Sequence, residues 1–313
     1  MRIAVLGPGG VGGLLAAVLE RGSAEVVVVA RRSTAGLIAQ RGLSVSSVRF
    51  GEMLVRPRVV EALSEPVDAL LVATKAEGLS AGLERIEAAP GIVLPLLNGL
   101  DHIELLRSRF RPADVPAGSI RVEADRPEPG VVVHTSPFLL VSMATAHPDA
   151  VAAMDALAAA LSEVEIPVKV QMPVSRASEA NVLWSKLVRL NALACTTSAY
   201  DVLLGRIRDT PQLRADLVGA IEEAAAVARA EGADAVDAER AVQELQDAHP
   251  TLGSSMQRDI AAGRAPELDE IPGSVLRAAA RHGIPCPTVE RLVRAISSRA
   301  GVPLPAVLGP AGP

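Results

Sequence analysis

The first half of the chain alternates short apolar runs with stretches that carry apolar residues at helical spacing. An apolar run over residues 2–6 ends in the glycine-rich segment 7–12 (GPGGVG). An apolar helical face follows over residues 14–19, and a second apolar run over residues 26–30. Runs that are apolar throughout are typical of strands buried on both faces of a parallel sheet. We therefore expect a strand, a tight loop, a helix and a parallel strand, in this order.

Six further segments have the composition of strands, at residues 43–48, 53–58, 67–73, 91–97, 131–134 and 139–143. The first two alternate apolar and polar positions, which predicts a small hairpin beside the main sheet. The last two follow a Pro/Gly turn, and we expect them to be antiparallel. Alternating strands and helices indicate an α/β fold, with a mostly parallel sheet covered by helices on both faces.

The glycine segment has a specific chemical use. Gly7 allows a tight turn, Gly9 lets the backbone approach a pyrophosphate, and Gly12 lets the helix pack closely on the strand. The helix that opens at Gly10 and Val11 offers unpaired N–H groups to an anion. The segment therefore predicts the first βαβ turn of a Rossmann-type dinucleotide-binding domain.

From about Met172 the strand signals stop and helical periodicity takes over. We expect helices near residues 174–191, 210–231, 236–248, 270–282 and 288–299. Residues typical of helix C-terminal caps and first turns support these limits: Gly232, Gly283, Gly301, Pro211 and Pro287. The predicted domains are a dinucleotide-binding domain over residues 1–168 and an all-helical substrate domain over 169–313. The Pro/Gly/Ala-rich tail over residues 303–313 is expected to fray.

The end of the second strand indicates which dinucleotide binds. A carboxylate there would accept the ribose 2′-hydroxyl of NAD, but the chain has Ala30, Arg31 and Arg32. Because a guanidinium pairs well with a 2′-phosphate, we expect NADP(H). The alternative is that both arginines are solvated surface residues.

Composition narrows the function classes. The formal net charge is −5 and aromatic residues make up 2%, so no nucleic-acid partner is expected. No apolar run reaches the ~20 residues of a membrane span. Met1-Arg2 leads directly into the first strand, and we expect a cytoplasmic protein with no membrane partner. Cys195 and Cys286 are expected to be free thiols, and the histidine spacing predicts no metal site.

Two polar residues follow predicted strands of the first half, where ligands bind in open parallel sheets. They are Lys75 and Asn98. The alternatives are a surface lysine and a turn-forming asparagine.

Three candidates lie in the helical half. Lys186 lies at the rim of an apolar helix stripe and is either a partly desolvated proton donor or a lysine whose amine reaches solvent. Ser254 and Ser255 precede a short helix and are either ligand-binding residues or N-caps. Glu267 is either part of a site or a charge that favours the next helix N-terminus.

In their order and spacing, these motifs resemble the ketopantoate reductase (2-dehydropantoate 2-reductase) family over nearly the whole chain. The matching blocks are residues 7–12, Arg31, Thr74-Lys75-Ala76, Leu96-Leu97-Asn98-Gly99, Trp184-Ser185-Lys186-Leu187, residues 254–260, Gly263-Arg264 and Glu267-Leu268-Asp269.

The resemblance implies a role for each candidate. Asn98 would lie between nicotinamide and substrate. Lys186 would protonate the carbonyl oxygen as hydride arrives at C2, Glu267 would hold the substrate hydroxyl and steady Lys186, and Ser255 would bind the substrate carboxylate. The residues implied to hold NADP(H) are Gly7, Gly9, Gly10, Val11, Gly12, Arg31, Lys75 and Asn98.

The chain departs from the family at three positions where asparagine is usual, which hold Leu190, Ala194 and Leu252. Asn191 is one position late and lies on another face of the helix, whereas Thr197 returns to the face of the lysine. The implied pocket is therefore less polar than is usual in the family.

The resemblance implies NADPH-dependent reduction of a 2-oxo acid to a 2-hydroxy acid, with ketopantoate to pantoate, in pantothenate biosynthesis, as the default. One alternative is a reductase of a more apolar ketone in secondary metabolism. The other is a non-catalytic NADP-binding protein. Ala-rich helices near residues 216–230 and 276–280 are compatible with a homodimer and equally with ordinary core packing.

Overall fold

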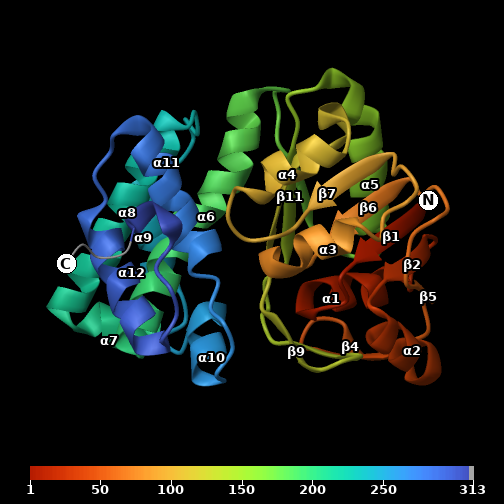
Figure 1. Ribbon diagram of the computed structural model, residues 1–313, viewed down its shortest axis with the longest axis horizontal. Helices are drawn as coiled ribbons and strands as arrows, with labels where there is room; N and C mark the ends of the chain where they lie inside the picture. The colour runs from red at the N-terminus through yellow and green to blue at the C-terminus, as the bar shows by residue number, and fades with distance from the viewer. Residues whose placement is uncertain (310–313) are drawn as a thin grey trace. The chain divides into compact units, whose positions relative to one another are not determined.

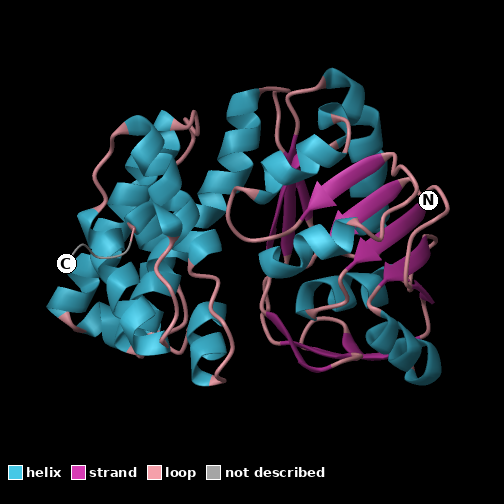
Figure 2. Cartoon of the chain, in the orientation of Figure 1, coloured by secondary structure: helices cyan, strands magenta, loops and turns pink. Residues whose placement is uncertain are grey.

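The computed structural model describes residues 1–309 and divides into two compact units. Unit 1 comprises residues 1–97 and 102–182, and unit 2 comprises residues 98–101 and the chain from residue 183. Unit 1 contains every strand of the described chain, and unit 2 is built from helices (Figure 2). This agrees with the predicted α/β class and helical second half.

Unit 1 is organised around a five-stranded parallel sheet (Figure 1). Its strands, in spatial order, are β5 (Arg58–Val60), β2 (Glu25–Val29), β1 (Arg2–Leu6), β6 (Ala69–Val72) and β7 (Ile92–Pro95). Alternate residues of β1 face two different cores, with Ile3 and Val5 in one and Ala4 and Leu6 in the other. This is why the strands read as apolar throughout.

Helices cover both faces of this sheet. One core packs α1 (Gly10–Leu19) and α5 (Val151–Glu163) against it, and the other packs α3 (Leu79–Leu83) and α4 (His102–Arg109). The other helices that lie wholly within unit 1 are α2 (Arg32–Arg41), η1 (Ala76–Gly78), η2 (Pro112–Asp114) and η3 (Pro148–Ala150).

Two smaller sheets complete unit 1. One has the order β4 (Gly51–Val55), β3 (Leu43–Ser47), β10 (Val131–His134), β9 (Ala124–Glu128), and the other β12 (Val168–Val170), β11 (Leu140–Ala144), β8 (Ala117–Arg121). The antiparallel pairing of β3 with β4 confirms the predicted hairpin. The strands over residues 131–134 and 139–143 do not pair with each other. β10 pairs antiparallel with β9 and parallel with β3. β11 pairs antiparallel with β8 and parallel with β12.

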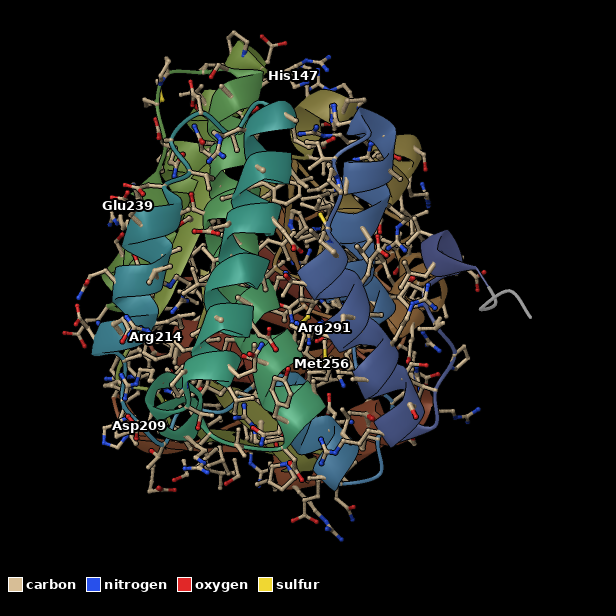
Figure 3. All side chains as sticks on the ribbon, turned by 90° about the vertical axis from the view of Figure 1, so that its left-hand side faces the viewer. His147, Asp209, Arg214, Glu239, Met256 and Arg291 are labelled. Atoms are coloured by element: carbon tan, nitrogen blue, oxygen red, sulfur yellow. The ribbon has the colours of Figure 1, made fainter. Side chains whose placement is uncertain are left out.

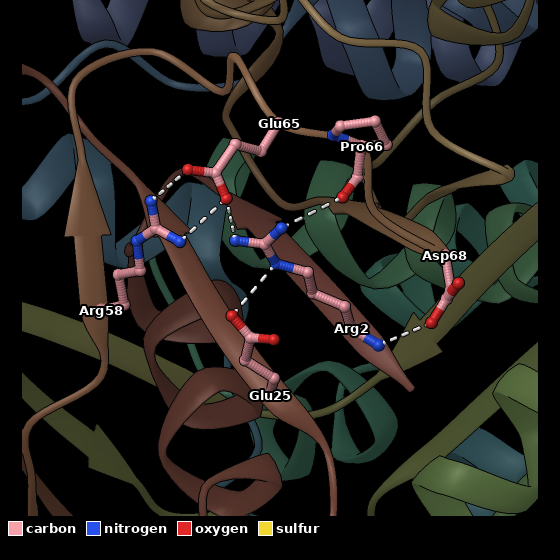
Figure 4. Close-up of polar contacts among 6 residues, drawn as sticks. All are labelled: Arg2, Glu25, Arg58, Glu65, Pro66 and Asp68. Carbon is pink, nitrogen blue, oxygen red and sulfur yellow. Dashed lines mark hydrogen bonds and ion pairs between the residues drawn. The ribbon is translucent and has the colours of Figure 1, made fainter.

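A network of charges ties together the amino-terminal ends of the parallel strands (Figure 4). Arg2 contacts Glu25 at 3.1 Å and Glu65 at 2.5 Å, and its backbone N–H donates to Asp68 at 2.7 Å. Arg58 donates to the same Glu65 carboxylate. These hydrogen bonds, from Arg58 first and then Arg2, lower the pKa of Glu65 to about 2. The candidate ligand residues lie at the carboxyl ends of the strands. The charge network lies at the opposite edge of the sheet.

Unit 2 holds most of α6 (Arg176–Tyr200) and the helices that follow it. These are α7 (Leu204–Asp209), α8 (Pro211–Ala230), α9 (Ala238–Asp247), α10 (Ser255–Ala261), the π-helical turn η4 (Asp269–Gly273), α11 (Ser274–His282), α12 (Pro287–Ala300) and η5 (Ala306–Leu308). Gly283 and Gly301 cap α11 and α12 in the left-handed conformation, as predicted, and Pro211 and Pro287 open α8 and α12.

The compact units divide inside α6, at residues 182 and 183, and not at the predicted boundary of residues 168 and 169. The intervening residues are held in unit 1 because β12 pairs with β11. In addition, Glu179 accepts hydrogen bonds from Arg107 at 2.6 Å and from the Ala146 N–H at 3.0 Å.

Of the tail predicted to fray, residues 306–308 form η5 and residues 310–313 lie outside the described residues. No helix within residues 1–309 is long and apolar enough to cross a bilayer.

A buried carboxylate joins three helices of unit 2. Asp216 of α8 is 4% exposed and accepts hydrogen bonds from Tyr200 of α6 and from Arg291 of α12. Burial acts to raise the pKa of Asp216, but the hydrogen bonds from Arg291 and Tyr200 outweigh it and the pKa is lowered. The ionised carboxylate therefore stabilises the fold above about pH 4, and this contribution is lost as pH falls through the folded-state pKa.

We expect Asp216→Asn to lower the free energy of unfolding by about 1–3 kcal/mol at neutral pH, because hydrogen bonds to a buried charge are lost. The difference from wild type should shrink below about pH 4. The matched control is Asp209→Asn, which changes an exposed residue at the end of α7. Figure 3 labels both Asp209 and Arg291. Urea unfolding across pH measures both; a pH-independent difference for Asp216→Asn would contradict the prediction.

Candidate functional site

The glycine loop at the end of β1 is shaped by two close contacts. Gly7 has φ +89°, and a Cβ built on it would lie 2.8 Å from the Thr74 side chain. A Cβ on Gly12 would lie 2.2 Å from the carbonyl oxygen of Gly7. Only glycine permits this turn and this approach of helix α1 to the loop.

Gly9 has the opposite environment, because no described atom lies within 4 Å of a Cβ built there. Gly9 is the N-cap of α1 and provides no side-chain hydrogen bond to cap this helix end. The N–H groups of the first turn, including those of Gly10 and Val11, are therefore available to an anion. Open space beside uncapped N–H groups suits a pyrophosphate.

Position 10 requires glycine for a reason that the sequence did not reveal. A Cβ at this position would lie 2.3 Å from the carbonyl oxygen of Ala124 in β9. The constraint comes from a segment more than a hundred residues away, so no local pattern could indicate it.

The two neighbouring arginines have different surroundings. The guanidinium of Arg31 lies beside η1, 3.7 Å from a Cβ built on Gly78. Lys75 is the N-cap of the same η1 and follows β6 by three residues. The Arg32 side chain is 90% exposed and lies 3.8 Å from Glu61. Arg31 and Lys75 are therefore gathered at the carboxyl ends of β2 and β6, the strands that flank β1.

Three candidates that are distant in sequence meet within unit 2. The Lys186 amine donates to Oδ1 of Asn98 at 2.8 Å, and Nδ2 of Asn98 donates to Oε2 of Glu267 at 2.9 Å. All three residues are half-buried. Asn98 follows β7 by three residues, Lys186 is in α6, and Glu267 lies between α10 and η4. The sequence indicated each residue separately, but not that the amide connects the amine to the carboxylate.

This arrangement defines the orientation of the amide. Its oxygen faces a cationic donor and its NH₂ group faces an acceptor, so a flipped Asn98 would lose both hydrogen bonds. The result is a half-buried amine held in a fixed position and linked through one amide to a carboxylate. Such a group can stabilise negative charge on a ligand oxygen and donate a proton to it.

The two serines before α10 have separate positions. Ser254 is the N-cap, accepts from the Gln257 N–H at 3.1 Å and is hydrogen-bonded to Thr197 of α6 at 2.7 Å. Ser255 is the first residue of the helix and is half-buried. The capping role therefore belongs to Ser254, and the hydroxyl of Ser255 is left for other contacts.

The departures from the family pattern lie in α6 and just before α10. Leu190 and Leu252 are half-buried, and Ala194 is fully buried. Asn191 is also fully buried and accepts from the Cys195 thiol at 3.5 Å. Asn191 therefore faces the core of unit 2 and does not replace the asparagine missing at position 190.

Both cysteines are free and buried. Burial raises the pKa of the Cys195 thiol far above its ordinary value and that of Cys286 to about 12. Neither thiol has the thiolate character that a nucleophile needs.

Comparison with known proteins identifies the same family in both halves of the chain. Residues 3–142 match the model described as "Ketopantoate reductase PanE/ApbA", and residues 180–300 match "Ketopantoate reductase PanE/ApbA C terminal". A 2-dehydropantoate 2-reductase of Caulobacter vibrioides is 30% identical over 312 residues, which cover 95% of this chain and 99% of that protein.

Solved structures with the same fold cover nearly the whole chain. A 2-dehydropantoate 2-reductase from Geobacter metallireducens GS-15 superposes with a TM-score of 0.85 at 25% identity, covering 95% of this chain and 99% of that one. A D-mandelate dehydrogenase solved with NADH and anilino(oxo)acetate has a TM-score of 0.85 at 21% identity, with coverage of 96% and 98%. At that identity, the second likeness shows the fold alone. The two family matches and the relative at 30% identity show that this chain belongs to the ketopantoate reductase PanE/ApbA family of oxidoreductases.

Proposed function

We propose that this protein reduces a 2-oxo acid to a 2-hydroxy acid with NADPH, and that 2-dehydropantoate is its default substrate. The observation that carries the proposal is the hydrogen-bonded chain from Lys186 through Asn98 to Glu267. Relatives named 2-dehydropantoate 2-reductase support the choice of substrate.

The chemistry assigns one task to each group. A reduced nicotinamide, when bound, supplies the hydride that adds to C2. The Lys186 ammonium stabilises the charge that develops on the carbonyl oxygen and then gives it a proton, which yields the 2-hydroxy acid. Asn98 orients the amine. Glu267 accepts the hydrogen bond that fixes Asn98 and is the proposed partner of the substrate hydroxyl. Ser255 is the proposed donor to the substrate carboxylate.

The glycine loop is the proposed cofactor site, and its surroundings fit a dinucleotide. Uncapped N–H groups at the start of α1 and the open space at Gly9 suit the pyrophosphate. Arg31 and Lys75 are the proposed partners of the 2′-phosphate of NADPH. The preference for NADPH remains a prediction, and so does the homodimer.

A second candidate function follows from the apolar residues near the amine. Leu190 lies one helical turn after Lys186 on the same face, and it is half-buried. This favours a substrate whose substituent on C2 is apolar. The D-mandelate dehydrogenase with the same fold, solved with anilino(oxo)acetate, gives a precedent for a different oxo acid.

We expect Lys186→Ala to lower kcat for 2-oxo acid reduction by about 10²- to 10⁴-fold, because a general acid is removed. Lys169→Ala, at an exposed position of β12, is the matched control and should retain wild-type kcat. NADPH oxidation measures both variants, and equal rates would remove Lys186 from the mechanism.

The same assay distinguishes a polar from an apolar substrate. Wild type is given 2-dehydropantoate or its analogue 3,3-dimethyl-2-oxobutanoate, which lacks only the terminal hydroxyl. A site that hydrogen-bonds this hydroxyl should reject the analogue by about 10⁴-fold in kcat/KM. Comparable values, or a preference for the analogue, would favour the apolar substrate.

For the cofactor, we expect Arg31→Ala to raise the Kd of NADPH by about 10- to 100-fold and to leave that of NADH nearly unchanged, since a charge-assisted hydrogen bond to phosphate is lost. The exposed neighbour supplies the control, Arg32→Ala, which should have little effect. Fluorescence titration of each nucleotide measures the difference. A larger effect at Arg32, or equal losses for NADPH and NADH, would contradict the assignment.

A further inference from the structure

An arginine outside the proposed chemistry connects the two loop segments that carry Asn98 and Glu267. Arg277 of α11 donates to Oδ1 of Asp269 at 2.7 Å, to the Asp269 carbonyl oxygen at 2.8 Å and to Oδ2 of Asp101 at 2.5 Å. Asp101 follows Asn98 by three residues, and Asp269 follows Glu267 by two. One guanidinium therefore links both segments.

The same segments also meet at the backbone. Gly99 has φ +82°, and a Cβ built on it would lie 2.2 Å from the carbonyl oxygen of Glu270 in η4. A side chain at this position would push the segment of Asn98 away from η4. This close approach restricts the distance between the two segments.

The segment of Glu267 has an unusual backbone. It leads into η4, a π-helical turn that contains Pro272, and the Ile271 N–H donates to the carbonyl oxygen of Glu267 at 3.1 Å. π-helical turns are rare and frequently occur at functional sites. Arg277 holds the first residue of this turn through both its side chain and its carbonyl oxygen.

We propose that Arg277 is a positioning residue for the proposed reduction, which holds Asn98 and Glu267 at the spacing that lets one amide bridge the Lys186 amine and the Glu267 carboxylate. The inference rests on the proposed function for its kinetic consequence. The two hydrogen bonds of Asn98, at 2.8 and 2.9 Å, need both segments in place at once. A shift of about 1 Å in either segment would break one of them, and misplacement of this size can cost about 10²-fold in rate.

Arg277 is suited to this task for a physical reason. Asp101 and Asp269 are each more than half exposed, whereas the Arg277 side chain is 26% exposed. Without the cation, the two carboxylates would repel each other and turn to water. The planar fork of arginine binds both of them and a carbonyl oxygen, which the single ammonium of a lysine cannot reproduce.

The kinetic test compares Arg277→Met with Arg281→Met, which removes an ion pair to Glu231 one turn further along the same helix. We expect Arg277→Met to lower kcat for 2-oxo acid reduction by about 10- to 100-fold, with a smaller change in KM. Arg277→Lys should recover only part of kcat, and Arg281→Met should match wild type in both respects.

A second readout does not depend on activity. The side-chain NH₂ signal of Asn98, assigned by its loss in Asn98→Ala, should shift and exchange faster with water in Arg277→Met but not in Arg281→Met. If the wild-type enzyme reduces no 2-oxo acid, the proposed function fails while this signal still tests whether Arg277 positions Asn98.

Two outcomes would overturn the proposal. One is an Asn98 signal that is the same in Arg277→Met and Arg281→Met. The other is an active enzyme whose kcat and KM do not change in folded Arg277→Met. A lower melting temperature with unchanged kinetics would count as the second outcome, because it indicates a purely structural ion pair.

Discussion

The side-chain amide of Asn98 has one orientation that satisfies both of its neighbours, and the proposed chemistry depends on it. Its oxygen accepts from the Lys186 amine, and its NH₂ group donates to Glu267. A lysine on an amphipathic helix would otherwise extend its amine to solvent. Here the amine is held in place by an amide that a carboxylate fixes in turn. A fixed ammonium is what a developing oxyanion requires.

Steric constraints fix the geometry of the proposed cofactor site, the glycine loop at the start of α1. The turn at Gly7 and the contact of Gly12 with it fix the start of α1, and the uncapped helix end leaves donors for an anion. The charge network of Arg2 and Glu65 ties the opposite edge of the same sheet. At one edge of the sheet the charged side chains are thus paired with one another, whereas the other edge gathers Arg31 and Lys75, as a site for a phosphorylated ligand requires.

The sequence predicted those parts whose physical cause is local. Strands β1, β2, β6 and β7 are apolar runs because both faces are buried, and the caps at Gly283 and Gly301 follow from the need for a left-handed residue. The edge strands β5, β8, β9 and β12 were missed. β9 is largely exposed and contains Pro127, and β5 and β12 have three residues each. β8 is built mainly from small residues, with Ile120 as its one large apolar side chain, so none of the four carries a clear apolar pattern.

Features that depend on distant segments could not be predicted in this way. The periodicity of α6 continues through residue 182, so its pattern gives no sign that the compact units divide there. The reason for glycine at position 10 is the backbone of Ala124. In the same way, Asn98, Lys186 and Glu267 were each identified by motif, but the bridging role of the amide and the link through Arg277 appear only once the chain is folded.

The central claim is that the Lys186 ammonium reaches the carbonyl oxygen that is reduced. A crystal structure of the dead-end complex with NADP⁺ and a 2-oxo acid tests it most directly. We predict that Nζ of Lys186 lies within hydrogen-bond distance of the C2 carbonyl oxygen, about 2.6–3.2 Å, while its bond to Asn98 is retained. A bound 2-oxo acid whose carbonyl oxygen is beyond reach of Nζ and contacts a different donor would contradict the account.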